Sequence, residues 1–377
     1  MSEYQYYEFQ AIDRALSADQ VDKLRSYSTR AQITSTTFTN EYSWGSFKGN
    51  PDAWMEKYFD AFVYLANWGT YILKLRLSSS LLGAGSAKKY LGGAWVKEKL
   101  GKVVLSFVSE DEEGDGDWVE GQGHLSSMIS VRADLARGDW RALYLGWLMR
   151  AQAGELADQT VEPPVPPGLG KLTASLDAMA EFLRIDRDLI DVAAQTSPPM
   201  NEMSTTPAEV HTWVAGLSAK QKDDLLANLI VDGDHSAAVG LFQKFLKESG
   251  RNEKNSAGSR TVRDLLKAAQ QRSEERQQAE AELRAKATAR RDRQAAIARE
   301  KHLNGLAGQQ DNLWTKVNAL LHTKRQPEFA QAAAILVDLR DLAGAAGSAD
   351  FGLRIAELRR MHPRKRTFLD MLAKAGL

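Results

Sequence analysis

The sequence predicts an α+β domain at the N-terminus, followed by all-α regions that include a long charged helix and a C-terminal helical module. Alternation of apolar and polar side chains, which is typical of half-buried strands, is confined to the first 110 residues. From residue 124 onward, apolar residues recur at helical spacing instead. Residues 261–303 contain no Gly, Pro or aromatic residue and carry 11 Lys or Arg against 7 Asp or Glu, which favours one uninterrupted helix.

Three elements are expected before the first aromatic cluster. Residues 5–12 alternate Tyr7 and Phe9 with polar neighbours, which predicts a half-buried strand. A helix should begin at Ser17, because Gln20 completes a capping box that satisfies free backbone N–H groups of the first turn. The β-branched run at 31–42 predicts a second strand.

A helix rich in aromatic residues is predicted at 51–67. Asn50 is a suitable N-cap, and Pro51 fits the first helical position. Gly69 can take the left-handed conformation that ends a helix. The aromatic side chains would share one broad apolar side of this helix, so we expect them to be core residues.

The loop before this helix carries three aromatic residues that no predicted element buries: Tyr42, Trp44 and Phe47. They alternate with Gly45 and Gly49, and no predicted helix or strand covers them. Exposed aromatic residues are common at protein interfaces. We therefore predict that this aromatic loop contacts a protein partner.

Two more strands, at 70–77 and 102–109, complete the first domain. Both show strong alternation or β-branched content, and the segment between them is expected to be helical. The resulting order of strands and helices predicts a ferredoxin-like sandwich, with helices on one face of a four-stranded sheet.

Shifts in composition divide the chain into six parts. Four of the ten prolines fall at 163–167, which indicates a stiff extended tether. The long helix lacks a sustained heptad pattern, so we prefer a solvated connector helix to a rod shared by two chains, and the oligomeric state stays open. The expected parts are an α+β domain with appended helices (1–158), a Pro-rich tether (159–171), a helical middle region (172–250), a linker (251–260), the long charged helix (261–303) and a helical C-terminal module (311–377).

The composition limits the classes of site that the chain can build. The absence of Cys excludes disulfides, thiolate zinc sites and iron–sulfur clusters, and we expect no cofactor. The N-terminus lacks the basic and apolar regions of a secretory signal, and no apolar run reaches the length of a membrane span. We therefore expect a cytoplasmic protein without membrane contact.

The acidic segment 110–122 is the nearest approach to a cation-binding loop. Asp111, Glu113 and Asp115 match positions 1, 3 and 5 of an EF-hand loop. Gln122 stands where that loop requires a bidentate Glu. We therefore expect an acidic surface turn after a strand rather than a metal site.

The C-terminal third is the basic end of a chain whose formal net charge is zero, with 22 Lys or Arg against 14 Asp or Glu in residues 261–377. Its densest cluster lies at a predicted helix end and consists of Arg359, Arg360, Arg364, Lys365 and Arg366. Such a cluster can bind the phosphate backbone of nucleic acid. It can equally complement the dipole of a helix C-terminus, which we prefer.

Parts of the sequence resemble two kinds of bacterial protein. "SEYQYYEFQAIDR" and "NEYSWGSFKGNPDAWMEKYFDAFVYLANWGT" are similar to an uncharacterised bacterial protein family of the same length, which implies no activity. The tail, with Trp314, "ILVDLRDLA", Phe351 and "ELRRMHPRKRTFLDMLAKAGL", resembles over about 65 residues the helical tail of bacterial SWIM zinc-finger proteins. A SWIM finger needs Cys ligands, which this chain lacks, so the resemblance implies no zinc site.

No convergent set of acid, base and nucleophile can be named from the sequence. We therefore predict a non-enzymatic cytoplasmic protein-interaction or scaffold protein, which presents the aromatic loop and the basic C-terminal module to protein partners. One alternative is a nucleic-acid-associated protein that binds through the basic C-terminal third. The other is an enzyme whose site forms only by tertiary convergence.

Overall fold

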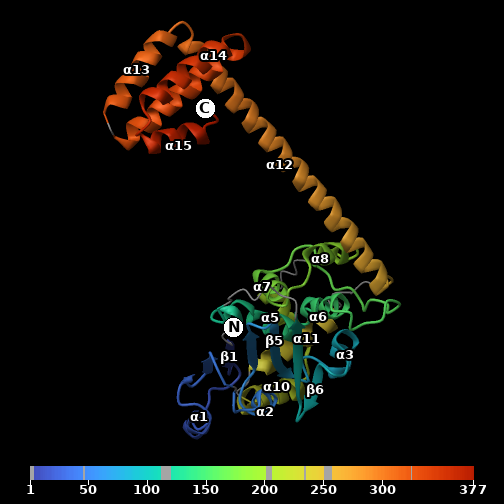
Figure 1. Cartoon of the computed structure of the whole chain (residues 1–377). Coiled ribbons are helices and arrows are strands. Elements are labelled where there is room, and N and C mark those ends of the chain that lie inside the picture. The colour runs from blue at the N-terminus through green and yellow to red at the C-terminus, as the bar shows by residue number, and fades with distance from the viewer. Residues whose placement is uncertain are drawn as a thin grey trace. The chain divides into compact units, whose positions relative to one another are not determined.

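The computed structural model describes residues 4–45, 47–111, 120–200, 206–232, 235–249, 257–323 and 325–377 (Figure 1). The chain forms two compact units, Met1–Glu275 and Arg276–Leu377, and each is described by itself. The first unit holds a sheet covered by helices and the second unit is helical, so the predicted order of an α+β part followed by helical regions is confirmed.

A seven-stranded antiparallel sheet forms the centre of the first unit, in the order β2-β3-β1-β4-β5-β7-β6. The predicted four-stranded ferredoxin-like sheet is therefore wrong, while the α+β class is confirmed. The strands are β1 (Gln5–Gln10), β2 (Gln32–Ile33), β3 (Thr37–Tyr42), β4 (Ala61–Ala66), β5 (Thr70–Ser78), β6 (Val96–Lys99) and β7 (Lys102–Glu110).

The aromatic helix predicted at 51–67 is wrong in its second half. α2 (Pro51–Lys57) begins as expected, with Asn50 Oδ1 accepting a hydrogen bond from the N–H of Ala53 at 3.0 Å. The following residues form β4, which pairs with β1 on one side and β5 on the other. β4 is buried on both faces and is apolar throughout, so its sequence has neither a strand nor a helix period to identify it.

Tight turns join β4 to β5 and β6 to β7. Gly69, expected to end a helix, instead lies in the β4–β5 turn with a φ of 91°. A Cβ at this position would lie 1.9 Å from the carbonyl oxygen of Asp111. β6 occupies part of the segment expected to be helical, and Leu100 and Gly101, with φ of 51° and 73°, join it to β7. Two-residue turns with positive φ match the twist of antiparallel hairpins.

The two faces of the sheet are covered differently. The inner face packs under six helices: α3 (Ala84–Leu91), α4 (His124–Met128), α5 (Ser130–Arg137), α6 (Arg141–Gln152), α7 (Ala174–Phe182) and α8 (Arg187–Ala194). The outer face carries a smaller aromatic core, to which α1 (Ala18–Arg25), α2 and the loop after β3 contribute. Residues alternate between these cores along β5, so that Leu73 lies in the inner core and Ile72 packs on the outer one.

The proline-rich segment 159–171, expected to be a tether, packs into the inner core instead. Val165 and Leu169 are buried there, and the Tyr90 hydroxyl donates a hydrogen bond to the carbonyl of Pro164 at 2.7 Å. Prolines favour an extended backbone. The backbone around the prolines of this segment is extended, but it runs against other elements of the unit rather than through solvent. The composition therefore indicated the local conformation but not its packing.

Three further helices follow in the predicted middle region: α9 (Pro207–Gly216), α10 (Ala219–Asp232) and α11 (His235–Glu248). α9 begins with a capping box, in which Thr206 and Glu209 bond reciprocally. Of the predicted linker 251–260, residues 251–256 lie outside the described residues.

The long charged helix is confirmed as α12 (Val262–Leu306). Its start is anchored to the first unit by the buried carboxylate of Glu162. This carboxylate accepts hydrogen bonds from Arg260 Nε and Nη2, both at 2.9 Å, and from the Tyr144 hydroxyl at 2.7 Å. Residues 274–298 are exposed on all sides of the helix.

The second unit has its own helical core, as predicted, formed by α13 (Gln310–His322), α14 (Gln326–Met361) and α15 (Arg366–Lys374). Gly344 interrupts α14 with a φ of 55° and a ψ of −162°, which divides it into two helical stretches. Within the described part of the chain, no helix combines the length and the apolar character needed to cross a membrane.

Candidate functional site

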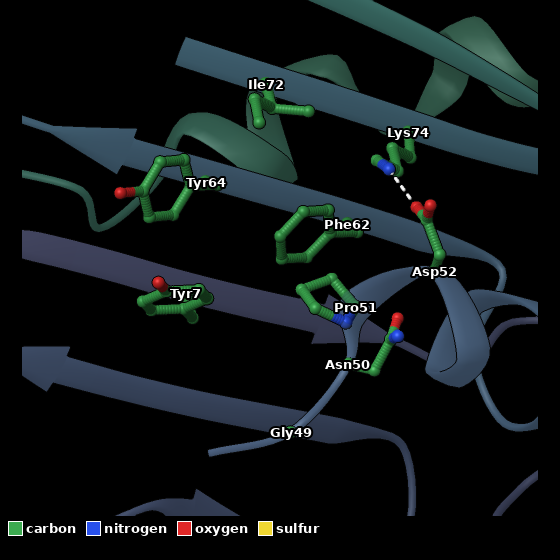
Figure 2. Close-up of a pocket in the computed structure, with 9 residues that line it drawn as sticks. All are labelled: Tyr7, Gly49, Asn50, Pro51, Asp52, Phe62, Tyr64, Ile72 and Lys74. Atoms are coloured by element: carbon green, nitrogen blue, oxygen red, sulfur yellow. Dashed lines mark hydrogen bonds and ion pairs between the residues drawn. The ribbon is translucent and has the colours of Figure 1, made fainter. Parts of the chain in front are cut away.

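A hollow of about 410 Å³ opens on the outer face of the sheet, beside the start of α2 (Figure 2). Strands β1, β4 and β5 supply its floor, and the chain leading into α2 supplies a wall. The lining residues are Tyr7, Gly49, Asn50, Pro51, Asp52, Phe62, Tyr64, Ile72 and Lys74. This hollow combines an aromatic floor with a charged end and lies next to the predicted aromatic loop.

Strand pairing assembles the floor from residues that are distant in the sequence. Tyr7 lies opposite Tyr64, and Tyr64 lies opposite Ile72. Phe62 lies opposite Lys74 on the same pair of strands. Because directly paired residues point to the same face of a sheet, these side chains converge on one surface. Figure 2 shows the two tyrosines toward one end of the hollow and Lys74 toward the other.

Gln5 holds the two tyrosines and the aromatic loop together. Its Oε1 accepts hydrogen bonds from the hydroxyls of Tyr7 at 2.8 Å and Tyr64 at 3.2 Å, and its Nε2 donates to the carbonyl of Gly45 at 3.0 Å. Burial raises the pKa of both tyrosines, so both are neutral near pH 7. Tyr7 is buried and fixes the floor, whereas the half-buried Tyr64 offers aromatic surface and a hydroxyl oxygen that can accept a hydrogen bond from a ligand.

An ion cluster with excess positive charge forms the other end of the hollow. The Asp52 carboxylate pairs with both Lys74 and Lys97. Burial by itself would raise the pKa of Asp52, but the hydrogen bonds and charges of the two ammonium groups hold that pKa below its ordinary value. Asp52 is therefore ionised at neutral pH, and one positive charge remains in excess. This end suits a ligand that carries an anionic group.

The three residues of the predicted aromatic loop have different environments. Phe47 stacks on Tyr7 with ring centroids 4.8 Å apart, and Tyr42 meets Tyr7 edge-on at 5.7 Å, so both pack on the aromatic core. The side chain of Trp44 is 68% exposed, and the guanidinium of Arg30 lies 5.0 Å from the centre of its ring. Trp44 is therefore the loop residue that is accessible to a partner.

Sequence reasoning missed most of the residues that line the hollow. Tyr64 was expected on a helix, because Asn50 and Pro51 mark the start of α2 in the sequence but no residue marks its end at Lys57. The alternation in β5 does put Ile72 and Lys74 on one side of their strand. No local pattern, however, indicates that this side faces the same surface as Tyr7.

Comparison with known proteins adds no assignment. No family model, curated protein or solved structure matches this chain. The resemblances to an uncharacterised bacterial family and to a SWIM protein tail therefore stay predictions. Function has to be inferred from the geometry of the chain itself.

Of the predicted cation-loop residues, Asp111 is described, whereas Glu113 and Asp115 lie outside the described residues. Asp111 Oδ2 lies 3.7 Å from Nη1 of Arg184. Among the residues that the structure describes, no group of three or more His, Asp or Glu is arranged to hold a metal ion.

The predicted anion-contact cluster lies between the end of α14 and the start of α15. Its members are Arg359, Arg360, Arg364, Lys365 and Arg366. Lys365 Nζ donates to the carbonyl of Leu321, and Arg359 donates to the carbonyl of Leu377. Arg364 and Arg366 are exposed and form no ion pair with the described residues. These two arginines are therefore the members most available to an anion.

Proposed function

We propose that this chain is a non-enzymatic cytoplasmic protein that binds protein partners through the hollow and Trp44. The observation that carries this proposal is the 68% exposure of Trp44, on a loop that Gln5 fixes to the aromatic floor of the hollow. Tryptophan is enriched among the residues that dominate interface energies. A loop that is already held in place loses little conformational entropy on binding.

The chemistry of the hollow suits a partner that presents an apolar side chain next to an acidic group. Ile72 and the ring of Tyr64, which are both half-buried, offer apolar surface for the side chain, and the excess positive charge at Lys74 and Lys97 attracts a carboxylate. An acidic peptide segment with one aromatic or branched aliphatic residue has both features. Its apolar residue would supply most of the affinity, while the charges would govern orientation and association rate.

The ionisable groups of the hollow favour binding over catalysis. A general acid or base works best with a pKa near the working pH. The pKa of Asp52 is lowered by its two lysines, and the pKa values of Tyr7 and Tyr64 are raised by burial. These three groups are therefore suited to hold a ligand rather than to exchange protons with it.

A peptide-display selection tests this proposal. Random peptides are selected on the wild-type protein, and their affinities are measured by fluorescence anisotropy for the wild type, Trp44→Ala and Tyr64→Ala. We expect the selected peptides to share an apolar residue beside Asp or Glu, and to bind each variant at least about tenfold more weakly. Trp68→Ala is the matched control, because Trp68 is 46% exposed in the β4–β5 turn and does not line the hollow. Failure to enrich peptides, or an equal loss in the control, would contradict the proposal.

A second candidate function is binding of nucleic acid by the basic C-terminal third. It is supported by the exposed Arg364 and Arg366, and by the 22 basic against 14 acidic residues in 261–377. Contacts of Lys and Arg with phosphates weaken steeply as salt rises. Pull-downs from bacterial lysate, with and without nuclease and across a salt series, separate the two functions. Binding that nuclease and an Arg364→Gln/Arg366→Gln variant both abolish would favour nucleic acid.

A further inference from the structure

Helices α9, α10 and α11 enclose an apolar groove of about 430 Å³ in the first unit. α9 lines it with Val210, Trp213 and Val214, whose spacing puts them on one side of the helix, and Leu217 at its C-cap adds a further apolar side chain. α10 and α11 turn apolar side chains toward the same groove. Lys222 is the charged residue among the described residues that line it.

The apolar side chains that line the groove are partly exposed to solvent. One of the helices that carry them, α11, is hydrogen-bonded to the rest of the unit. Val214 is 40% exposed, Leu226 is 58% exposed, and α9 buries none of its residues. α11 is fixed to the rest of the unit, because Gln243 Nε2 donates to the carbonyl of Leu81 at 3.1 Å. A large apolar surface on an anchored support is typical of a docking site, since covering it removes the surface from water.

Among the described residues that line the groove, Lys222 is the one that keeps hydrogen-bond donors for a partner, so an extended peptide backbone would find few groups to pair with. The indole N–H of Trp213 already donates to Glu248 Oε2 at 2.8 Å. Lys222 Nζ donates to the carbonyl of Ala215 at 3.2 Å, which leaves two of its N–H groups for a charged partner. An extended segment would bury its own N–H and C=O groups without partners, whereas a helix satisfies them internally. The occupant that fits this groove is therefore a helix.

The helices of this chain are poor candidates for the occupant. α15 is amphipathic, but its apolar side is in use, with Phe368 and Leu372 fully buried in the core of the second unit. In the exposed stretch 274–298 of α12, the large apolar residues are Leu283 and Ile297, which are too far apart to form a stripe. A helix from a different protein fits better.

We propose that this groove binds an amphipathic helix of a partner protein, with large apolar residues at positions i, i+4 and i+7 and a carboxylate that faces Lys222. Apolar anchors at this spacing are how helices occupy grooves. The site lies on different elements from the aromatic hollow, and it holds whether or not the hollow binds a peptide.

Fluorescent peptides test the proposal on the full chain. The panel consists of amphipathic helices of about 16 residues, with Leu at the three anchor positions and either Glu or Lys beside them. A control peptide of the same composition has two prolines in its centre, which prevent helix formation. Anisotropy titrations compare the wild type with Leu226→Asp in the groove and with Leu353→Asp, which replaces a 73% exposed leucine of α14 as a control for non-specific adhesion.

We expect the Glu peptide to bind the wild type saturably, Leu226→Asp to weaken this binding at least about tenfold, and Leu353→Asp to change it less than about twofold. Lys222→Glu should reverse the preference from the Glu peptide to the Lys peptide. Circular dichroism checks that the variants are folded. If Leu226→Asp unfolds, Val214→Asp on α9 supplies the same test.

Three binding results would overturn the proposal. These are equal affinity for the proline-containing control, equal affinity of Leu226→Asp and the wild type, and no saturable binding of any helix in the panel. A dimer in light scattering that Leu226→Asp dissociates would show that a second copy of the chain covers the groove, and would also overturn it.

Discussion

The inner and outer faces of the sheet show how the same strands can serve two purposes. On the inner face, helices cover the strands so completely that Leu73 and Leu75 are 0% exposed. On the outer face, α2 and the aromatic loop cover β1 but leave Tyr64 and Ile72 half-buried beside the hollow. Because successive side chains point to opposite faces, a strand can stabilise the fold with one set of residues and form a binding surface with the other.

The largest expected effect on stability is at Leu73, which we compare with its neighbour Ile72 on β5. Leu73→Ala removes a fully buried side chain and should lower the free energy of unfolding by about 2–5 kcal/mol, because the tightly packed inner core leaves a cavity. Ile72→Ala removes a half-buried side chain at the hollow and should cost about 1 kcal/mol. Urea denaturation followed by circular dichroism measures both changes. Similar costs would show that the outer face is covered as fully as the inner one.

An intermediate effect on stability is expected on acidification, because the carboxylate of Asp60 is hydrogen-bonded in the folded state. Asp60 accepts hydrogen bonds from Arg76 Nη2 and from the N–H of Ile12, both at 2.7 Å. Burial by itself would raise the pKa of Asp60, but the charge of Arg76 and the backbone N–H groups of Ile12 and Asp13 hold it below its ordinary value. The stabilisation is therefore complete above the unfolded-state pKa of about 3.9 and is lost as the pH falls through the lower pKa of the folded state.

Asp60→Asn should flatten the loss of stability on acidification from about pH 5 to pH 2, because asparagine has no proton to gain. Urea midpoints measured across this range for the wild type and the variant give the comparison. Asp22→Asn removes an exposed carboxylate of α1 and serves as the control for net charge. If both variants flattened the profile equally, the effect would come from overall charge rather than from the contacts of Asp60.

The helices were predictable from the sequence where short-range signals mark them. The capping boxes that begin at Ser17 and Thr206 are formed by residues three positions apart, so they are visible without knowledge of the fold. The uninterrupted α12 was equally readable from composition. These features depend on contacts within one or two helical turns.

The sheet and the hollow depend on contacts that the sequence does not display. β4 was mistaken for helix because both of its faces are buried, and the four residues of β6 are held by pairing with β7. The proline-rich segment 159–171 looked like a tether because its composition predicts a stiff backbone but does not predict which elements pack against it. Tyr7, Tyr64 and Lys74 meet only through strand pairing, so the hollow could not be assembled before the strand order was known.

The smallest effect on stability is expected at Trp44, in contrast to Phe47 on the same loop. Trp44→Ala should cost no more than about 1 kcal/mol, the value of an exposed cation–π contact such as that with Arg30. Phe47→Ala should cost about 2–3 kcal/mol, because Phe47 stacks on Tyr7 within the aromatic core. Urea denaturation of the two variants tests this difference. An equally large loss at Trp44 would mean that its side chain is packed in solution, and weaker peptide binding by Trp44→Ala would then reflect a disturbed loop. If Trp44→Ala is about as stable as the wild type, its weaker peptide binding is instead due to the loss of the contact that Trp44 makes with the peptide.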